Sequence, residues 1–293
     1  MEILLKHIKG INIATFNRRP FWIALVGGFA MAFFQNLNGV PSLFSPLADK
    51  QVVEAADIIT PKLAKKENTI VLQKQLGLSP LEIEAKAYIV VDMDTNEILA
   101  EKNATTPTAI ASLTKVLSAV IALDLADPSE QFVVSKKAAS IPPTKIGVVP
   151  GEKMTLSELL QAMLLTSAND ATEVIKEGID AKYKDKIFIQ AMNQKAKMIG
   201  MHNSQFTNPQ GFDAKGHYST PYDLALLSLY AMQHYPEIKE IAYKDYAFLP
   251  ENAQHKQFDL YNWNGLIGVY PNTFGLKTGV TERAGNTTIV MAE

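Results

Sequence analysis

The sequence predicts an α+β domain, because strand-like segments are separated from a long run of helical ones. Two strand segments with a tight turn between them lie at 87–103, helical segments occupy most of 112–235, and two more strand segments lie at 273–293. Runs of strands set apart from runs of helices are typical of α+β folds. We therefore expect the early hairpin and the late strands to share one antiparallel sheet, with the helices packed on it.

The composition favours a globular protein and excludes several kinds of site. The chain has 293 residues, enough for one large domain or two ordinary ones. Hydrophobic residues make up 47% and charged residues 20%, which favours a packed core over general disorder. The net charge of -2 argues against nucleic acid as a main partner. The absence of cysteine excludes disulfides, zinc–thiolate sites and cysteine nucleophiles.

The N-terminal segment, 1–39, predicts export. An apolar run at 21–34 follows a basic flank that holds Lys6, Lys9, Arg18 and Arg19. This arrangement is typical of a secretory signal, whereas a comfortable membrane-spanning helix needs roughly 20 apolar residues. A cleaved signal peptide and an uncleaved anchor both remain open, and the basic flank argues against a buried core helix. We expect an extracytoplasmic protein attached to the cytoplasmic membrane through this segment, on the periplasmic or cell-wall side.

Residues 40–85 are expected to form a linker, and residues 86–293 the folded domain. The linker mixes prolines, charges and short helical fragments without a sustained strand pattern. The domain opens with two strand-like segments around a tight turn at 93–96, which predict a hairpin. A helix is then expected from Ser112, with apolar residues on most of its faces.

Capping signals place the later helices. Thr155 and Glu158 form a T-x-x-E capping box ahead of an apolar helix. The "TSAND" segment at 166–170 predicts a turn before the next helix, and an amphipathic helix follows at 185–201. Thr220 and Pro221 supply a cap and a first-turn proline for the last long helix. The segments 273–281 and 285–293 predict two strands around a turn.

Three short motifs follow one another along the domain. They are S-x-x-K at Ser112–Lys115, S-x-N at Ser167–Asn169 and K-T-G at Lys277–Gly279. Each motif alone is weak, but their order is the one found in penicillin-binding proteins and serine β-lactamases. Together the three indicate an acyl-transfer site built on a serine nucleophile.

Ser112 and Lys115 suit a nucleophile and its base. Serine reacts only when a base lies within hydrogen-bond reach, and positions three apart share one helix face. A free lysine has a pKa of about 10.4, but burial and a second cation, such as Lys277, both disfavour its charge. We expect a partly neutral Lys115 that takes the Ser112 proton. The alternative is an ordinary serine helix cap.

The S-x-N motif is expected to serve the leaving group and the substrate amide. Ser167 would relay a proton toward the leaving amine, and Asn169 would hydrogen-bond the substrate's amide. The alternative is that Ser167, Asn169 or the neighbouring Asp170 simply caps the next helix.

The K-T-G strand is expected to hold the substrate. Lys277 and Thr278 would bind its carboxylate, and Gly279 would let its backbone pass close to the strand. The backbone N–H groups of Ser112 and Val280 would form the oxyanion hole at the helix N-terminus. The alternatives are an exposed strand lysine and a bulge glycine.

From about Lys86 onward the sequence resembles the serine-type D-alanyl-D-alanine carboxypeptidases, the low-molecular-mass penicillin-binding proteins of peptidase family S11. The resemblance is carried, in order, by "IASLTKVLSAVIAL", "GEKMTLSELLQAMLLTSANDAT" and "YPNTFGLKTGVTERAG". It implies a β-lactamase/transpeptidase-like fold and removal of the terminal D-alanine from peptidoglycan stem peptides through a serine acyl-enzyme. It also implies covalent inhibition by β-lactams and no metal or organic cofactor.

The resemblance assigns Ser112 as nucleophile, Lys115 as proton acceptor, Ser167 as an active-site hydroxyl and Lys277 as a substrate-binding residue. Family members usually continue well past K-T-G, with a further strand and a closing helix. Because this sequence stops at Glu293, we expect its catalytic domain to be C-terminally incomplete.

Three other functions remain open. A serine β-lactamase needs a deacylating glutamate, typically in E-x-x-L-N, and no glutamate between the second and third motifs has that context: Glu173, Glu177, Glu237, Glu240 and Glu251. A D,D-endopeptidase acting on cross-linked peptidoglycan is not distinguished by residue types. An inactive membrane-tethered cell-wall binding protein is the third. A metal hydrolase is disfavoured, since the five histidines form no H-x-x-x-H pattern.

Overall fold

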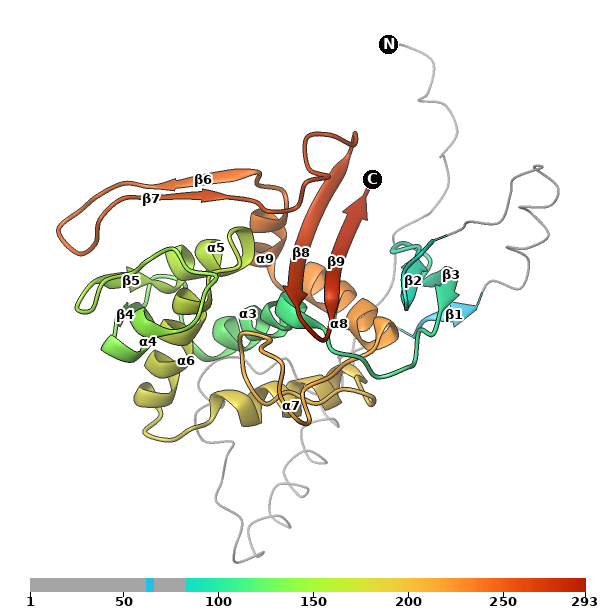
Figure 1. The fold of residues 1–293 in the computed structure, drawn as a ribbon, viewed down its shortest axis with the longest axis horizontal. Helices are drawn as coiled ribbons and strands as arrows, with labels where there is room; N and C mark the ends of the chain where they lie inside the picture. Colours follow the sequence, from blue (N-terminus) through green and yellow to red (C-terminus); the bar gives the residue numbers. More distant parts are fainter. Residues whose placement is uncertain (1–61, 66–82) are drawn as a thin grey trace, which may run out of the picture. The chain divides into compact units, whose positions relative to one another are not determined.

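The computed structural model describes residues 62–65 and 83–293 (Figure 1). The apolar run at 21–34 and most of the expected linker lie outside these residues, so the signal or anchor stays a prediction. Within the described ranges, no helix combines the length and the apolar character needed to cross a bilayer. One two-residue strand, β1 at Ala64–Lys65, falls inside the expected linker and pairs with the early hairpin.

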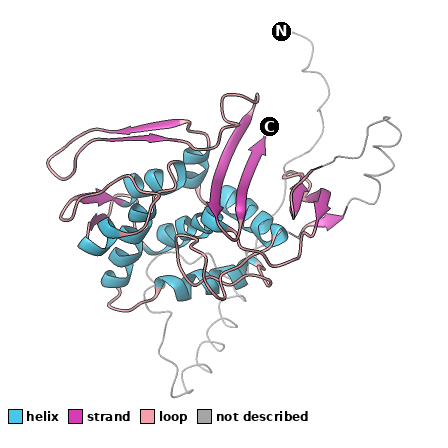
Figure 2. Ribbon diagram, viewed as in Figure 1, coloured by secondary structure: helices cyan, strands magenta, loops and turns pink. Residues whose placement is uncertain are grey.

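The architecture is α+β, as predicted, with a cluster of helices flanked by small sheets (Figure 2). The helical elements are η1 Ala111–Leu113, α3 Thr114–Leu125, α4 Lys136–Ser140, α5 Leu156–Leu165, α6 Asn169–Lys182, α7 Phe188–Ile199, α8 Pro221–His234 and α9 Pro236–Ala242. Besides β1, the strands are β2 Tyr88–Val91, β3 Glu97–Lys102, β4 Gln131–Val133, β5 Lys153–Thr155, β6 Tyr246–Leu249, β7 Phe258–Tyr261, β8 Thr273–Thr281 and β9 Gly285–Ala292.

Helix α3 lies at the centre of the helical cluster. It contacts α5, α6, α7 and α8, and ten of its twelve residues are buried. This confirms the prediction of a helix with apolar residues on most faces. Its first turn follows directly from η1, so the residue at 112 is held against the core by a helix that cannot shift without disturbing four neighbours.

The expected single sheet is wrong for the described residues. The early hairpin pairs β2 antiparallel to β3, and the late hairpin pairs β8 antiparallel to β9, in two separate sheets. The two hairpins pack on different elements: β2 contacts α8, whereas β8 and β9 contact η1. Each hairpin therefore packs on its own supporting elements, and no strand of one hairpin pairs with a strand of the other.

The predicted helix caps are confirmed. Thr155 accepts from the Glu158 N–H at 3.2 Å, while the Glu158 carboxylate accepts from the Thr155 N–H at 2.7 Å. Thr220 accepts from the Asp223 N–H at 3.1 Å, and Pro221 opens α8. These caps fix where α5 and α8 begin, and therefore where the turns around the site begin.

Two short hairpins were not predicted from the sequence. One pairs β4 with β5 and the other pairs β6 with β7, both antiparallel. The β6–β7 hairpin lies along the segment that carries α5 (Figure 1).

Candidate active site

Ser112 lies in η1, immediately before α3, and it does not cap either helix. The N-cap residues are Ile110 for η1 and Leu113 for α3, and neither helix has a side-chain cap. Ser112 is partly exposed, whereas Ala111 and Leu113 on either side are buried. The serine is therefore the one position of this turn that presents a side chain toward solvent, as a nucleophile must.

Lys115 lies in the core behind Ser112 and makes three short contacts. Its Nζ lies 2.9 Å from Ser112 Oγ, 2.8 Å from Asn169 Oδ1 and 2.7 Å from the Gln210 carbonyl oxygen. The two carbonyl oxygens can only accept hydrogen bonds. A neutral amine therefore donates its two protons to Asn169 and Gln210 and turns its lone pair toward the Ser112 hydroxyl, as a general base requires.

The electrostatic surroundings favour that neutral amine. Burial, together with the nearby charge of Lys277, lowers the pKa of Lys115 well below its ordinary value. Burial also lowers the pKa of Lys277, to about 7. Lys115 thus has the environment that the sequence predicts for a base, with the second cation that was expected beside it.

The S-x-N motif spans the end of the turn between α5 and α6. Ser167 is buried and has a left-handed φ of 60°, and Asn169 is the first residue of α6. Neither caps the helix, because its N-cap is Ala168 and no side-chain cap bond is present. Asn169 holds Lys115 through Oδ1 and donates from Nδ2 to the Pro142 carbonyl at 3.2 Å. Holding the base is a contact that the sequence did not predict.

The K-T-G motif lies on β8, and its lysine points inward. Lys277 is 2% exposed and donates to the Thr278 carbonyl at 2.7 Å, so it is not an exposed strand lysine. The register shift of β8 lies between Gly275 and Lys277, so Gly279 is not a bulge glycine. Thr278 is half-buried, and Val280 is 67% exposed beyond it.

Gly279 lies against the main chain of the nucleophile. A Cβ at this position would lie 2.7 Å from the Ser112 nitrogen and 3.1 Å from the Ala111 Cβ. Real Cβ atoms do not come this close to other heavy atoms. Only glycine therefore lets the main chain of β8 approach that of Ser112 this closely.

Gln210 is a site residue that sequence reasoning missed. Its carbonyl accepts from Lys115, and its side-chain nitrogen donates to Glu173 Oε2 at 2.5 Å. The other Glu173 oxygen pairs with Lys137. Gln210 lies in the segment "NPQGF", and its contact with Lys115 is made by its main chain.

His217 has a structural role close to Ser112. Its Nδ1 accepts from the Thr207 N–H at 3.1 Å, so the ring proton is on Nε2 and donates to Thr114 Oγ1 at 2.9 Å. Thr114 Oγ1 in turn donates to the Ala111 carbonyl at 2.9 Å. Burial lowers the pKa of His217 to about 4, so this neutral tautomer persists at ordinary pH.

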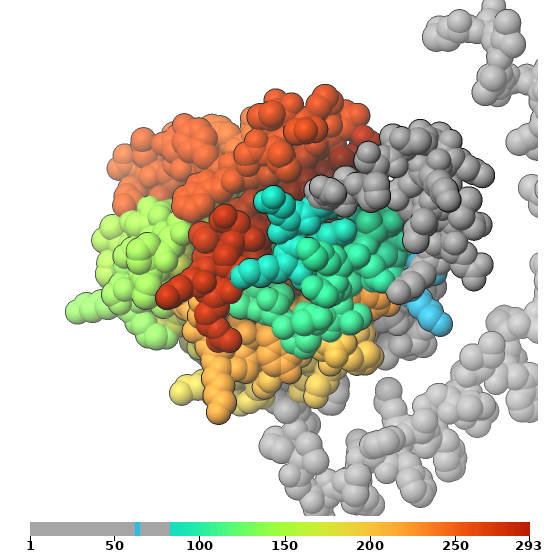
Figure 3. Space-filling model, turned by 45° about the vertical axis from the view of Figure 1, so that its right-hand side comes forward, coloured from blue at the N-terminus to red at the C-terminus, as the bar shows by residue number. Residues whose placement is uncertain are grey.

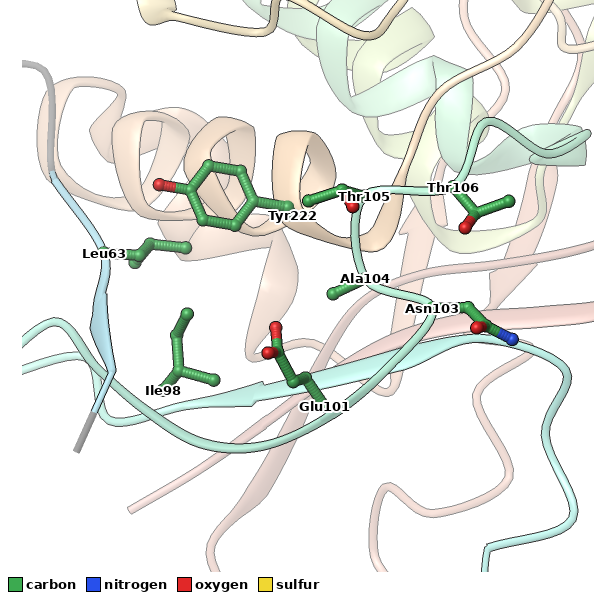
Figure 4. Close-up of a pocket in the computed structure, with 8 residues that line it drawn as sticks. All are labelled: Leu63, Ile98, Glu101, Asn103, Ala104, Thr105, Thr106 and Tyr222. Atoms are coloured by element: carbon green, nitrogen blue, oxygen red, sulfur yellow. The ribbon is translucent and has the colours of Figure 1, made fainter. Parts of the chain in front are cut away.

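A separate hollow of about 450 Å³ lies between β3 and the start of α8 (Figure 4). Its lining includes Ile98, Glu101, Asn103 and Tyr222. None of the three motifs contributes to it, and its lining contains no serine or lysine. The reactive cluster around Ser112 is therefore a different site.

The comparisons with known proteins point to one family. A sequence model described as D-alanyl-D-alanine carboxypeptidase, peptidase S11, matches residues 74–293. DacF of Bacillus subtilis, a D-alanyl-D-alanine carboxypeptidase, is 36% identical over 213 residues, which cover 70% of this chain and 53% of DacF. DacB2 of Mycobacterium tuberculosis, of the same description, is 30% identical over 205 residues, covering 69% of this chain and 68% of DacB2. This chain spans about half the length of DacF and of several other curated relatives.

Solved structures agree on the fold. The Streptomyces K15 DD-transpeptidase matches with a TM-score of 0.67 at 23% identity, over 74% of this chain and 87% of that one, which is a likeness of fold. A D-alanyl-D-alanine carboxypeptidase from Mycobacterium tuberculosis matches with a TM-score of 0.66 at 29% identity, over 73% and 80% of the two chains. The expected β-lactamase/transpeptidase-like α+β fold is thereby confirmed. With its three motifs gathered at Ser112 and its family match over residues 74–293, this chain belongs to the D-alanyl-D-alanine carboxypeptidase family, peptidase family S11.

Proposed function

We propose that this protein is a serine-type D-Ala-D-Ala carboxypeptidase that removes the terminal D-alanine from peptidoglycan stem peptides. The observation that carries the proposal is the 2.9 Å contact between Lys115 Nζ and Ser112 Oγ, with the two other directions around Nζ occupied by carbonyl oxygens. In that geometry the lone pair of the neutral amine faces the Ser112 hydroxyl, so the amine accepts the Ser112 proton.

The reaction then follows in two steps. Ser112 Oγ attacks the carbonyl carbon of the penultimate D-alanine as Lys115 accepts its proton. The peptide C–N bond breaks, the departing amine receives a proton through Ser167, and the peptide remains on Ser112 as an ester. Water hydrolyses this ester and restores the free serine, with Lys115 again accepting a proton. No metal or organic cofactor enters either step.

The remaining site residues hold the substrate in this scheme. Lys277 and Thr278 bind the terminal carboxylate, and Asn169 has a second Nδ2 proton free to bind the substrate amide while it holds Lys115. The N–H groups of Ser112 and Val280 stabilise the oxyanion. The close approach of Gly279 to the Ser112 nitrogen supports this pairing, because it brings the main chain of β8 beside that of η1.

Fast β-lactamase turnover is not supported. Glu173 is the buried glutamate nearest to the Lys115 network, but one of its oxygens pairs with Lys137 and the other accepts from Gln210. A deacylating base needs a free oxygen directed at the acyl group's water. β-Lactams are therefore expected to act as slowly released covalent inhibitors.

We also propose that the protein works outside the cytoplasm, attached to the cytoplasmic membrane through its N-terminal segment. The support is the basic flank and apolar run within residues 1–39. A site for peptidoglycan stem peptides belongs in that compartment, where its substrate is found.

The proposal is tested by covalent labelling and product release. A fluorescent penicillin is expected to label the wild type and the control Ser157→Ala, whose serine is exposed on α5, but not Ser112→Ala. The wild type is also expected to release D-alanine from a pentapeptide ending in D-Ala-D-Ala. Labelling that survives Ser112→Ala would move the nucleophile elsewhere, and labelling without D-alanine release would favour an inactive cell-wall binding protein.

A further inference from the structure

Both oxygens that hold Lys115 are supported by helix α6. Asn169, the first residue of α6, presents its Oδ1 to Lys115 Nζ at 2.8 Å. Glu173 lies four residues further along the same helix, and its Oε2 accepts from the Gln210 side-chain nitrogen at 2.5 Å. Gln210 in turn presents its carbonyl to Lys115 Nζ at 2.7 Å. Because residues four apart share one helix face, one face of α6 fixes both acceptors of the base, the first directly and the second through Gln210.

Gln210 is held on both sides of the carbonyl that it offers. The peptide unit between Gln210 and Gly211 accepts from Lys115 and donates to Asn208 Oδ1 at 2.8 Å. On the other side, the Gln210 side chain is tied to Glu173. A carboxylate can only accept hydrogen bonds, so the amide group of Gln210 turns its nitrogen toward Glu173. Loss of this bond would release the Gln210 segment from α6 at the point where it meets the base.

Glu173 is a buried carboxylate whose charge is compensated from the surface. It is 4% exposed, and a buried carboxylate is costly unless it is paired and hydrogen-bonded. Lys137 of α4 contacts its other oxygen, Oε1. Helix α4 packs against α6 (Figure 1), and the light-green part of the chain that carries α4 lies at the surface in Figure 3. The hydrogen bond to Glu173 raises the pKa of Lys137, so the pair stays ionic at ordinary pH.

The ion pair with Lys137 also preserves the neutral state of Lys115. An uncompensated carboxylate close behind the base would favour the ammonium form and raise the pKa of Lys115. The Lys137 charge on the Oε1 side of Glu173 offsets this effect, and burial together with Lys277 lowers the pKa of Lys115. Glu173 can therefore support the base through hydrogen bonds without holding a proton on it.

We propose that Glu173 is a positioning residue for the general base: through Gln210 it fixes the second carbonyl that orients the Lys115 lone pair toward Ser112. This inference rests on the proposed function, because it assigns a support to the base that the reaction uses. Without the support, the Gln210 carbonyl moves away from one N–H of the amine. The amine then rotates about its Cε–Nζ bond, and its lone pair faces the Ser112 hydroxyl for less of the time.

The test measures two constants for a fluorescent penicillin on the full-length protein: the dissociation constant of the first noncovalent complex and the acylation rate constant at saturation. Glu173→Ala is expected to lower the acylation rate constant about tenfold, as misplaced catalytic groups do. The dissociation constant is expected to stay unchanged, because Glu173 acts on the base rather than on the ligand. Glu173→Gln is expected to recover most of the loss, since its amide oxygen still accepts from Gln210.

Gln210→Ala carries the same test with Glu173 and its ion pair intact. The carbonyl is kept and only the tie to α6 is lost, so the acylation rate constant is expected to fall as in Glu173→Ala. The double variant is expected to lose no more than either single variant, because all of them remove one hydrogen bond. The rate constant does not depend on the folded fraction, so an unstable variant lowers only the amplitude of labelling.

Glu177→Ala, one helical turn further along α6, is the matched control. Glu177 pairs with Lys137 at 3.1 Å and accepts from Ser135 at 2.5 Å, so its removal leaves the bond between Glu173 and Gln210 in place. We expect the wild-type rate constant. An unchanged rate constant in Glu173→Ala, no recovery in Glu173→Gln, additive losses in the double variant or an equal loss in Glu177→Ala would overturn the inference while the wild type still releases D-alanine. A wild type that is not labelled and releases no D-alanine would instead defeat the proposed function itself.

Discussion

The main chain around Ser112 is held by two glycines. Ala111 has a left-handed φ of 50°. A Cβ at Gly211 would lie 1.9 Å from the Ala111 carbonyl oxygen. A Cβ at Gly279 would lie 2.7 Å from the Ser112 nitrogen on the other side. An alanine in the left-handed region is under strain, and these close approaches, with the Thr114 hydroxyl on the Ala111 carbonyl, keep it there. The direction of the Ser112 N–H depends on all of them.

Gly279→Ala is therefore expected to impair acylation strongly. The new methyl group must push apart β8 and the Ser112 main chain, which displaces the proposed oxyanion donors. A displacement of this kind costs on the order of a hundredfold in rate, and the rate constant for labelling by a fluorescent penicillin measures it. The control is Gly265→Ala, where an added Cβ meets nothing within 4 Å. A Gly279→Ala protein that is labelled at the wild-type rate would show that the close approach is dispensable.

His217 reaches the same main chain only through the Thr114 hydroxyl, so it is a positioning residue. His217→Ala takes the donor away from Thr114, and the Ala111 carbonyl loses a fixed partner. We expect the acylation rate constant to fall about tenfold or more. His217→Gln, whose amide N–H can still reach Thr114, is expected to recover part of the loss. His202→Ala, at an exposed histidine, is the control.

The pH profile separates positioning from a general loss of stability. Protonation at Nδ1 removes the acceptor for the Thr207 N–H, and the pKa of His217 is about 4. The wild-type acylation rate should therefore show a titration near pH 4, at constant folded fraction, that is absent from His217→Gln. A profile shared by both proteins would rule out the positioning role.

Side-chain identity decides what the sequence can reveal about this site. Ser112, Lys115 and Lys277 could be singled out from the sequence, because hydroxyl and amine side chains at those spacings are the groups that the proposed chemistry uses. Gln210 contributes a main-chain carbonyl to Lys115, and any residue type supplies one, so the sequence holds no signal for it. The left-handed φ of Ala111 is equally invisible, since alanine does not favour that conformation.

At the scale of elements, α6 packs on β4 through a glycine. A Cβ at Gly178 would lie 2.1 Å from Phe132 Cδ1, so Gly178→Ala should force a buried ring to move. In an open helix this change stabilises by roughly 0.5–1 kcal/mol, but overpacking costs about 1–3 kcal/mol. We expect net destabilisation, measured by urea unfolding. In a Phe132→Ala background the obstruction is gone and the same substitution should stabilise; destabilisation there as well would contradict this packing.

Element length explains which elements the sequence predicted. Helices such as α5 and α8 can be predicted from their caps and from apolar spacing over ten residues or more. The strands of the two missed hairpins have only three or four residues, such as β4 and β7, too few for alternation to be distinguished from chance. The elements on which the hairpins pack decide whether the hairpins form one sheet or two. A local sequence pattern does not indicate that packing.

At the scale of the whole molecule, the two buried lysines are expected to lower stability near neutral pH. The pKa of Lys277 is about 7 in the folded protein, against an ordinary value of 10.5, and the pKa of Lys115 is lowered as well. Between pH 7 and 10 the unfolded chain binds these protons and the folded chain does not. The free energy of unfolding therefore rises with pH across that window, since the unfolded state holds more protons.

Replacing one of these lysines should remove its share of the pH dependence. Each depressed lysine contributes a slope of about 1.4 kcal/mol per pH unit, so Lys277→Met is expected to unfold with a shallower slope. The variant should be more stable than the wild type at pH 7, with the difference shrinking toward pH 10, because an apolar side chain needs no hydration in the core. Urea unfolding of both proteins at several pH values measures this, and Lys215→Met, at an exposed lysine, is the control. Parallel curves for wild type and Lys277→Met would mean that Lys277 keeps its ordinary pKa in the fold, and its position beside Lys115 would then not help to make that base neutral.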